Sequence, residues 1–264
     1  MNQESWVGHL LESIEHSLKQ TAISPHTKNR PIVVVDVDLT IVDNQERTRA
    51  ILRDYIQSRP MPFPQKSAIL ETIQTLPIEF SIGKNLAALG IPLDEVRTDA
   101  RDFWQKRFFS DRYLHYDVPY IGAVEALQSL VKRGAFVAYV TGRIASTMAA
   151  GTVREFLHHG FPVTTADSML IMKTSHEEED TEFKIRSLNS LFDIGQPVWL
   201  VDNEPRICNA WHDMMSNRQP APTTPRWLVM HRTTRHSPGA PPLHPGIAQM
   251  NMWLPVSGEY AQND

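Results

Sequence analysis

Two hydrophobic periods alternate along this 264-residue chain. Short aliphatic runs of strand length occur at 32–35, 136–140, 169–172, 198–201 and 227–230. Apolar residues at helical spacing lie between them, at 123–132, 146–159 and 182–192. Strands that alternate with helices are typical of a parallel sheet covered on both faces. The pattern therefore predicts an α/β fold with a Rossmann-like parallel sheet.

The chain between the first and second of these strands has a different character. Residues 44–117 carry helical patterns broken by turn signals, and 93–109 interleave aromatic and arginine side chains as expected for a helix with one buried face. We therefore expect an inserted all-helical cap. The expected division is an N-terminal helix (4–20) and linker within 1–30, an α/β core of 31–43 and 118–232, a cap of 44–117, and a Pro-rich irregular tail of 233–264.

Composition narrows the classes of partner. The chain has 26 Lys and Arg against 30 Asp and Glu, a net charge of −4, so it lacks the basic excess that draws proteins to nucleic acid. Cys208 is the only cysteine, which excludes an intramolecular disulfide. No apolar run is long enough to cross a bilayer. These features predict a soluble cytoplasmic protein with no nucleic-acid or membrane partner.

Three of the predicted strands end in polar residues. Because the carboxyl ends of parallel strands meet at one edge of a sheet, these residues should converge there. They are Asp36, Asp38 and Thr40 after the first strand, Thr141, Gly142 and Arg143 after the second, and Asp202, Asn203 and Glu204 after the fourth.

Asp36 and Asp38 point to the same side of an extended chain, and two adjacent carboxylates repel. Either one of them is protonated or a divalent cation lies between them; Mg²⁺ takes oxygen ligands of this kind. With Asp36, Asp202 and a backbone carbonyl on the ion, Asp38 would be free to carry a proton. The pair would then divide into a nucleophile and an acid/base.

The run DVDLT, the strand end AYVTGR, a lysine on a later helix and a final strand with an acidic end occur in an order that resembles the haloacid dehalogenase-like (HAD) superfamily of phosphohydrolases. The resemblance covers about residues 31–232. The place of the insertion, just after the first motif, is similar to that of the family's C1-type cap.

The resemblance implies residue roles. Asp36 would attack phosphorus and form an aspartyl-phosphate, Asp38 would protonate the leaving oxygen and later activate water, and Thr141 would hydrogen-bond the phosphoryl group. The lysine is Lys184, at the position that the family's lysine occupies, with Lys173 as the alternative. The implied metal ligands for Mg²⁺ are Asp36, Asp38, Asp202 and Asn203, and the implied substrate contacts are Thr40, Gly142, Arg143 and Lys173.

One departure concerns the last strand. Many members of the family end it with two acids, whereas Asp202 is followed here by neutral Asn203 and then Glu204. Asn203 could coordinate through its oxygen, with Glu204 supporting the ligands. Asp43 and Arg143 lie near the expected site and serve equally well as turn or salt-bridge residues.

The resemblance implies a Mg²⁺-dependent phosphatase for a small phosphorylated metabolite. The second aspartate favours ester hydrolysis over dehalogenation, because an alkoxide leaving group needs a proton and a halide does not. Phosphomutases and phosphotransferases share the first step. The alternatives are a metabolite-binding or regulatory protein without turnover, to which Asn203 points, and a polynucleotide-end phosphatase, which the acidic balance disfavours. The substrate and the oligomeric state do not follow from the sequence.

Overall fold

A six-stranded parallel sheet forms the centre of the computed structural model, which describes residues 30–60, 63–91, 93–218 and 227–253. Its strand order is β5-β4-β1-β6-β7-β8, and every neighbouring pair is parallel. The strands are β1 (Pro31–Val35), β4 (Phe136–Ile144), β5 (Ser168–Lys173), β6 (Gln196–Asp202), β7 (Leu228–Arg232) and β8 (Ala248–Met250). The first strand thus lies between β4 and β6, and the ends of these three strands are neighbours.

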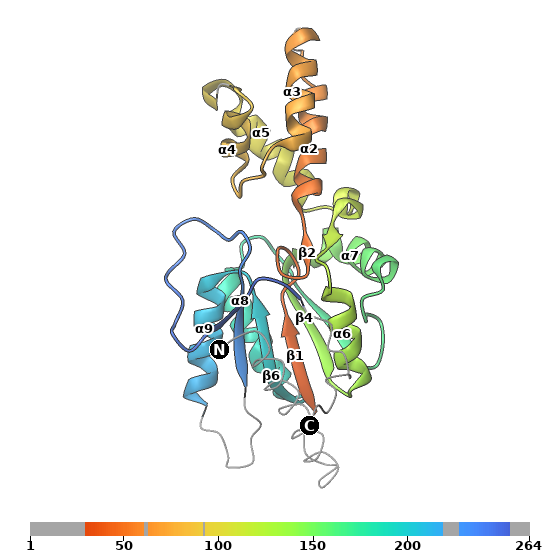
Figure 1. Cartoon of the computed structure of the whole chain (residues 1–264), viewed down its shortest axis with the longest axis vertical. Helices are drawn as coiled ribbons and strands as arrows, with labels where there is room; N and C mark the ends of the chain where they lie inside the picture. Colours follow the sequence, from red (N-terminus) through yellow and green to blue (C-terminus); the bar gives the residue numbers. More distant parts are fainter. Residues whose placement is uncertain (1–29, 61–62, 92, 219–226, 254–264) are drawn as a thin grey trace, which may run out of the picture.

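Helices cover both faces of this sheet, with α6 (Ala123–Lys132) and α7 (Ala145–His159) on one side and α8 (Asp180–Leu191) and α9 (Pro205–Asn217) on the other (Figure 1). Successive residues of β1 alternate between the two cores. Val33 and Val35 pack on the α6/α7 side, whereas Ile32 and Val34 pack on the α8/α9 side. All four are fully buried, as expected of a strand covered on both faces. The predicted α/β fold class is confirmed.

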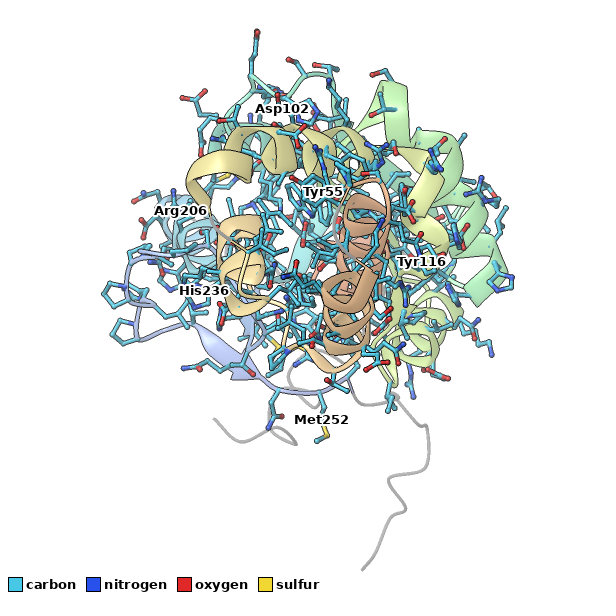
Figure 2. The ribbon with its side chains drawn as sticks, turned by 90° about the horizontal axis from the view of Figure 1, so that it is seen from above. Tyr55, Asp102, Tyr116, Arg206, His236 and Met252 are labelled. Atoms are coloured by element: carbon cyan, nitrogen blue, oxygen red, sulfur yellow. The ribbon has the colours of Figure 1, made fainter. Side chains whose placement is uncertain are left out.

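Between β1 and β4 the chain leaves the sheet to form four helices, which we call the helical module (residues 45–108). They are α2 (Gln45–Gln57), α3 (Phe63–Thr75), α4 (Ile82–Ala88) and α5 (Leu93–Phe108). A separate apolar cluster that includes Leu52, Ile73 and Leu86 holds them together. In the view from above (Figure 2), the module overlies the core, with His236 and Tyr116 to either side of α2.

Short elements connect the module to the core. The two-residue strands β2 (Val42–Asp43) and β3 (Val118–Pro119) pair antiparallel, and the 3-10 helix η1 (Asp111–Tyr116) precedes β3. The outgoing and returning chains therefore lie side by side. This pairing fixes the base of the module next to the end of β1.

The segment expected to be an irregular tail is partly ordered on the sheet, and the prediction is wrong there. Residues Ala248–Met250 form β8 and pair with β7, and the Trp253 indole is buried and donates to the carbonyl of Thr40 at 2.8 Å. Prolines delimit this strand without occupying it, which is why a Pro-rich composition misled the interpretation. The predicted helix at 4–20 lies outside the described residues. No helix in the described part of the chain has the length and apolar character needed to span a membrane.

Candidate active site

The loop after β1 brings Asp36 to the carboxyl end of the sheet. The amides of Thr40, Ile41 and Val42 all donate to the carbonyl of Val37, which winds the chain into a tight turn. Leu39 in this turn has φ of 61°, a left-handed conformation that is rare for a branched apolar residue. Such strain is concentrated at functional sites. The turn directs the Thr40 hydroxyl back to Asp36 Oδ2, to which it donates at 3.0 Å.

Lys184 connects the ends of two strands. Its Nζ donates to Asp36 Oδ1 at 2.7 Å and to Asp202 Oδ2 at 2.5 Å. All three side chains are buried. Lys184 lies on α8, the helix that precedes β6, so the packing of α8 on the sheet places the ammonium group between the two carboxylates. Lys173, the alternative lysine, instead pairs with Asp180 at 2.8 Å and lies nearby at the end of β5.

Burial and mutual charge shift the pKa values of Asp36, Asp202 and Lys184, which we call the triad. Burial raises the pKa of Asp36 to about 7, and the charge of Asp202 adds to this effect while Lys184 opposes it. The pKa of Asp202 is also raised by burial against the opposing charge of Lys184. Burial alone would lower the pKa of Lys184, but the two carboxylates outweigh it and raise that pKa. With both acids ionised, the triad carries one net negative charge in a buried place, which favours a further cation.

The donors at this position fit Mg²⁺. They are hard oxygen atoms: the carboxylates of Asp36 and Asp202 and the amide oxygen of Asn203, which accepts from the Thr40 hydroxyl at 3.3 Å. Among the described residues, no group of three or more His, Cys, Asp or Glu side chains is arranged to hold a metal. A cation at Asp36 and Asp202 would therefore need carbonyl, amide or water oxygens to complete its shell, which is common for Mg²⁺.

Asp38 belongs to a different group of charges. Arg143 donates to both of its carboxylate oxygens, through Nε at 2.7 Å and Nη2 at 3.1 Å, and Arg47 Nη2 also pairs with it. The two arginines bind Asp117 as well, Arg47 through Nε at 2.7 Å and Arg143 through Nη2 at 2.6 Å. We call these four residues the charge network. It joins the end of β1, the end of β4, the first turn of α2 and the residue before β3.

The charge network changes two expectations for Asp38. Burial alone would raise the pKa of Asp38, but Arg143 and Arg47, together with hydrogen bonds from Arg143 and Asn44, outweigh it and lower that pKa. The arginines therefore favour the ionised form of Asp38 in this arrangement, and its role as a proton carrier stays a prediction that requires these contacts to loosen. Since both of its oxygens accept from arginines, its carboxylate is also a poor candidate for the metal.

Arg143, which was expected to contact substrate, lines the cavity and also makes several bonds within the protein. Besides Asp38 and Asp117, its guanidinium donates to Thr152 Oγ1 at 3.1 Å, and only 3% of its side chain is exposed. All of its described bonds lie inside the protein. Asp43 forms a turn, since its carboxylate accepts from the amide and side chain of Gln45 at 2.9 and 2.7 Å.

The remaining expected residues lie around one cavity of about 500 Å³ between the sheet edge and the helical module. Thr141, Gly142, Lys173 and Asn203 line it, together with Asp36, Asp38 and Lys184. Thr40 and Asp202 are fully buried behind this lining and contact it through Asp36 and Lys184. Glu204 has a supporting position: its amide donates to Asp202 Oδ1 at 2.8 Å and its carboxylate accepts from Ser237.

Sequence reasoning missed Arg235. It comes from the segment after β7, lines the cavity, and donates through Nη1 to the carbonyl of Ile78 in the helical module at 2.6 Å. Its own carbonyl accepts from Asn203 Nδ2 at 2.7 Å. Arg47 and Asp117 were missed too. Each is a single charged residue without a motif, so only the arrangement in space identifies them.

Comparisons with known proteins give matches among solved structures. No family model matches the chain, and a search of curated proteins finds no match. The structure of a "Putative Phosphatase" from Clostridium difficile is similar at a TM-score of 0.50 and 12% identity, over 77% of this chain and 85% of that one. A HAD-superfamily hydrolase from Geobacter sulfurreducens is similar at a TM-score of 0.48 and 14% identity, over 84% of this chain and 92% of that one. A HAD-superfamily hydrolase from Ehrlichia chaffeensis is similar at a TM-score of 0.46 and 14% identity, over 84% of this chain and 91% of that one.

These similarities concern the fold. Several of the similar solved structures are named HAD-superfamily hydrolases or phosphatases. The likeness to the Clostridium difficile structure supports the α/β fold that the resemblance implied. At identities of 12–14% the likeness does not extend to residue roles or substrate.

Proposed function

We propose that this protein is a Mg²⁺-dependent phosphatase that hydrolyses a small phosphate monoester through a phosphorylated Asp36. The observation that carries the proposal is the position of Lys184, which bridges Asp36 and Asp202 at the edge where β1, β4 and β6 end. Buried structural ion pairs also occur, but this one lines a cavity large enough for a small metabolite.

In the first step, a carboxylate oxygen of Asp36 attacks phosphorus, and the bond from phosphorus to the ester oxygen breaks. The Thr40 hydroxyl, which donates to Asp36 Oδ2, orients the attacking group. Lys184 offsets negative charge on the phosphoryl oxygens, and Thr141 lies in the cavity wall, where its hydroxyl can donate to them. A Mg²⁺ ion held by Asp36, Asp202 and further oxygens would neutralise charge on the phosphoryl group.

The departing alkoxide needs a proton, and in the second step water must lose one as it attacks phosphorus and releases phosphate from Asp36. Asp38 can do both, giving its proton in the first step and regaining it in the second. Its ionised form in the charge network is the state that the second step needs. For the first step, contact with one arginine must weaken. Because Arg47 lies on α2, a movement of the helical module would achieve this.

The helical module would act as a cap. Residues of the module, among them Thr48, Phe80 and Trp104, line the same cavity as the residues at the strand ends. Closure of the module over a cavity of this size would exclude water from the reacting phosphoryl group, and the cavity suits a small substrate better than a duplex end. The net charge of −4 likewise gives no support to a polynucleotide substrate.

The experiment that tests the proposal is phosphate release from a panel of phosphate monoesters with Mg²⁺. The wild-type protein should release phosphate, EDTA should abolish release, and Asp36→Asn should be inactive at unchanged thermal stability. Asp102→Asn is the matched control, because Asp102 is exposed on α5 and is outside the cavity lining. Activity that persists in Asp36→Asn would refute the assignment of the nucleophile.

Two observations favour a second candidate, a metabolite-binding protein without turnover. Asp38 is engaged by two arginines, and Asn203 stands where a second acid is common. This candidate predicts tight, Mg²⁺-dependent binding of a phosphorylated metabolite and no phosphate release across the panel. Release that depends on Asp36 would exclude it.

A further inference from the structure

The cavity has two chemically different parts. Its phosphate-binding end is formed by polar residues at the strand ends, among them Asp36, Thr141 and Lys184. The helical module and the residue after it contribute large aromatic side chains instead: Phe80, Trp104, Phe108 and Phe109. His176, from the loop between β5 and α8, adds a further ring. The part of the cavity that would receive the alcohol of a phosphate ester is thus rich in rings.

Three of these rings form a fixed surface, which we call the aromatic wall (Trp104, Phe108 and Phe109). Trp104 and Phe108 stack with centroids 4.4 Å apart, and Phe109 lies edge-on to both, at 6.1 and 5.2 Å. His176 lies edge-on to Phe109 at 4.5 Å. Rings that hold one another in place lose little conformational entropy when a ligand packs on them. The aromatic wall is therefore prepared to receive a flat apolar group.

Phe80 lies in the loop between α3 and α4 of the helical module. It lines the same cavity, yet 48% of it is exposed. Three hydrogen bonds hold its loop: Arg235 donates to the carbonyl of Ile78 at 2.6 Å, the amide of Glu79 donates to Asn85 Oδ1 at 2.8 Å, and Asn85 Nδ2 donates to the carbonyl of Glu79 at 3.1 Å. A positioned loop that presents an exposed phenyl ring to a cavity offers apolar area that a ligand can cover.

We propose that the substrate is a phosphate ester whose alcohol carries a planar aromatic ring, which packs against the aromatic wall and Phe80. The inference rests on the proposed function, because it assigns the phosphoryl group to the other end of the cavity. A sugar phosphate could bond to polar lining residues such as Glu79 and Gln105, but it would leave these rings without an apolar contact. A nucleobase and a simple aryl group are two sources of the same chemistry.

The test compares two pairs of substrates with Mg²⁺. Adenosine 5′-monophosphate is paired with ribose 5-phosphate, and benzyl phosphate with propyl phosphate; within each pair the leaving group is a primary alkoxide, so a difference in kcat/KM reports on the ring. We expect the ring-bearing member to have a kcat/KM about tenfold or more higher in at least one pair, because stacking contributes this much per base. A preference in the first pair alone identifies a nucleobase, and one in the second alone an aryl group. Equal or reversed values in both pairs overturn the inference.

A variant pair separates ring recognition from packing. In Phe109→Leu, the ratio of kcat/KM within the preferred pair should fall severalfold. Phe103→Leu is the control, because Phe103 lies on α5, which ends one residue before Phe109, but packs against Tyr55 at 5.2 Å and is outside the cavity lining. Its ratio should equal that of the wild type. A fall of the ratio in both variants, or in neither, contradicts the role of the aromatic wall.

Binding to the Asp36→Asn variant, measured by calorimetry with the same four compounds, gives a result that needs no turnover. Tighter binding of the ring-bearing members without hydrolysis by the wild type would reject the phosphatase and keep the inference about the ligand. Hydrolysis of all four compounds at similar kcat/KM, with similar affinities, would keep the phosphatase and reject the ring. The two proposals therefore fail in distinguishable ways.

Discussion

Lys184 Nζ donates to Asp36 Oδ1 at 2.7 Å although the two residues are 148 positions apart. The strand that carries Asp36 is central in the sheet, and α8 packs on one of its faces, so the contact follows from the fold. The same ammonium group reaches Asp202. One lysine thus bonds to carboxylates at the ends of two strands. We predict that Lys173, which pairs with Asp180, cannot take over this role in catalysis.

Replacement of Lys184 by Met removes the cation between the two buried carboxylates. We expect phosphate release to fall at least about 100-fold, the size of loss seen when a group that stabilises charge in a transition state is removed. Lys173→Met is the matched control: Lys173 also lines the cavity but pairs with Asp180, a mostly exposed residue. It should lose much less. Steady-state kinetics with Mg²⁺ decides, and equal losses in the two variants would speak against the assigned roles.

The charge network predicts a specific pattern of stability. Arg47→Leu leaves Asp38 and Asp117 with one arginine between them, and should lower the free energy of unfolding by about 3 kcal/mol. The double variant Arg47→Leu/Asp117→Leu retains Asp38 and Arg143 as a neutral pair. Its loss should be smaller than the sum of the two single losses by about 1 kcal/mol or more. Urea unfolding of the four proteins measures this, and additive losses would show that the network is not a unit.

Mg²⁺ should stabilise the fold more strongly as pH rises. Without a cation, the pKa of Asp36 is raised from 3.8 to about 7, so the unfolded chain releases this proton at lower pH than the folded protein does. The stability that Asp36 contributes is therefore lost as pH rises from about 4 to 7. A cation at Asp36 and Asp202 offsets this loss. The shift in melting temperature on addition of Mg²⁺ should be larger at pH 8 than at pH 5 by differential scanning fluorimetry; a shift independent of pH would argue against a cation beside Asp36.

Arg235 should control how firmly the helical module is held over the cavity. Arg235→Ala removes the hydrogen bond to the carbonyl of Ile78. We expect faster amide hydrogen exchange in residues 76–81 and a KM raised about tenfold. A hydrogen bond to a charged group stabilises a structure by roughly 1.5–3 kcal/mol, so its loss should loosen this loop over the cavity. Arg206→Ala is the control, because Arg206 is an exposed residue on α9 (Figure 2). Unchanged exchange in 76–81 would show that the bond does not hold this loop.

The sequence specified the sheet and its reactive edge because both depend on local patterns. Aliphatic runs identify buried strands, and Asp36, Thr141 and Asp202 follow such runs directly. The charge network could not be found in this way. Arg47 and Asp117 are 70 positions apart, and each resembles an ordinary surface charge until the pairing of β2 with β3 brings their segments together. Their effect on Asp38 was therefore invisible as well.

The C-terminal segment shows a second limit. Its prolines indicated an irregular tail, yet β8 depends on an edge that β7 offers, and that edge is a property of the folded sheet. Arg235 lies in this segment and reaches the cavity only because β7 and β8 hold the chain between them. Motif reasoning, which ended at the acidic strand end, passed over it.

The central claim is that Asp36 becomes phosphorylated during turnover. The direct measurement is mass spectrometry of the protein after rapid acid quenching with substrate and Mg²⁺, because acid preserves an acyl phosphate. The account predicts a phosphoryl group on the peptide that contains Asp36, and none on that peptide in Asp36→Asn or after incubation with EDTA. Turnover with no phosphorylated peptide at any quench time, or with the phosphoryl group on another residue, would contradict it.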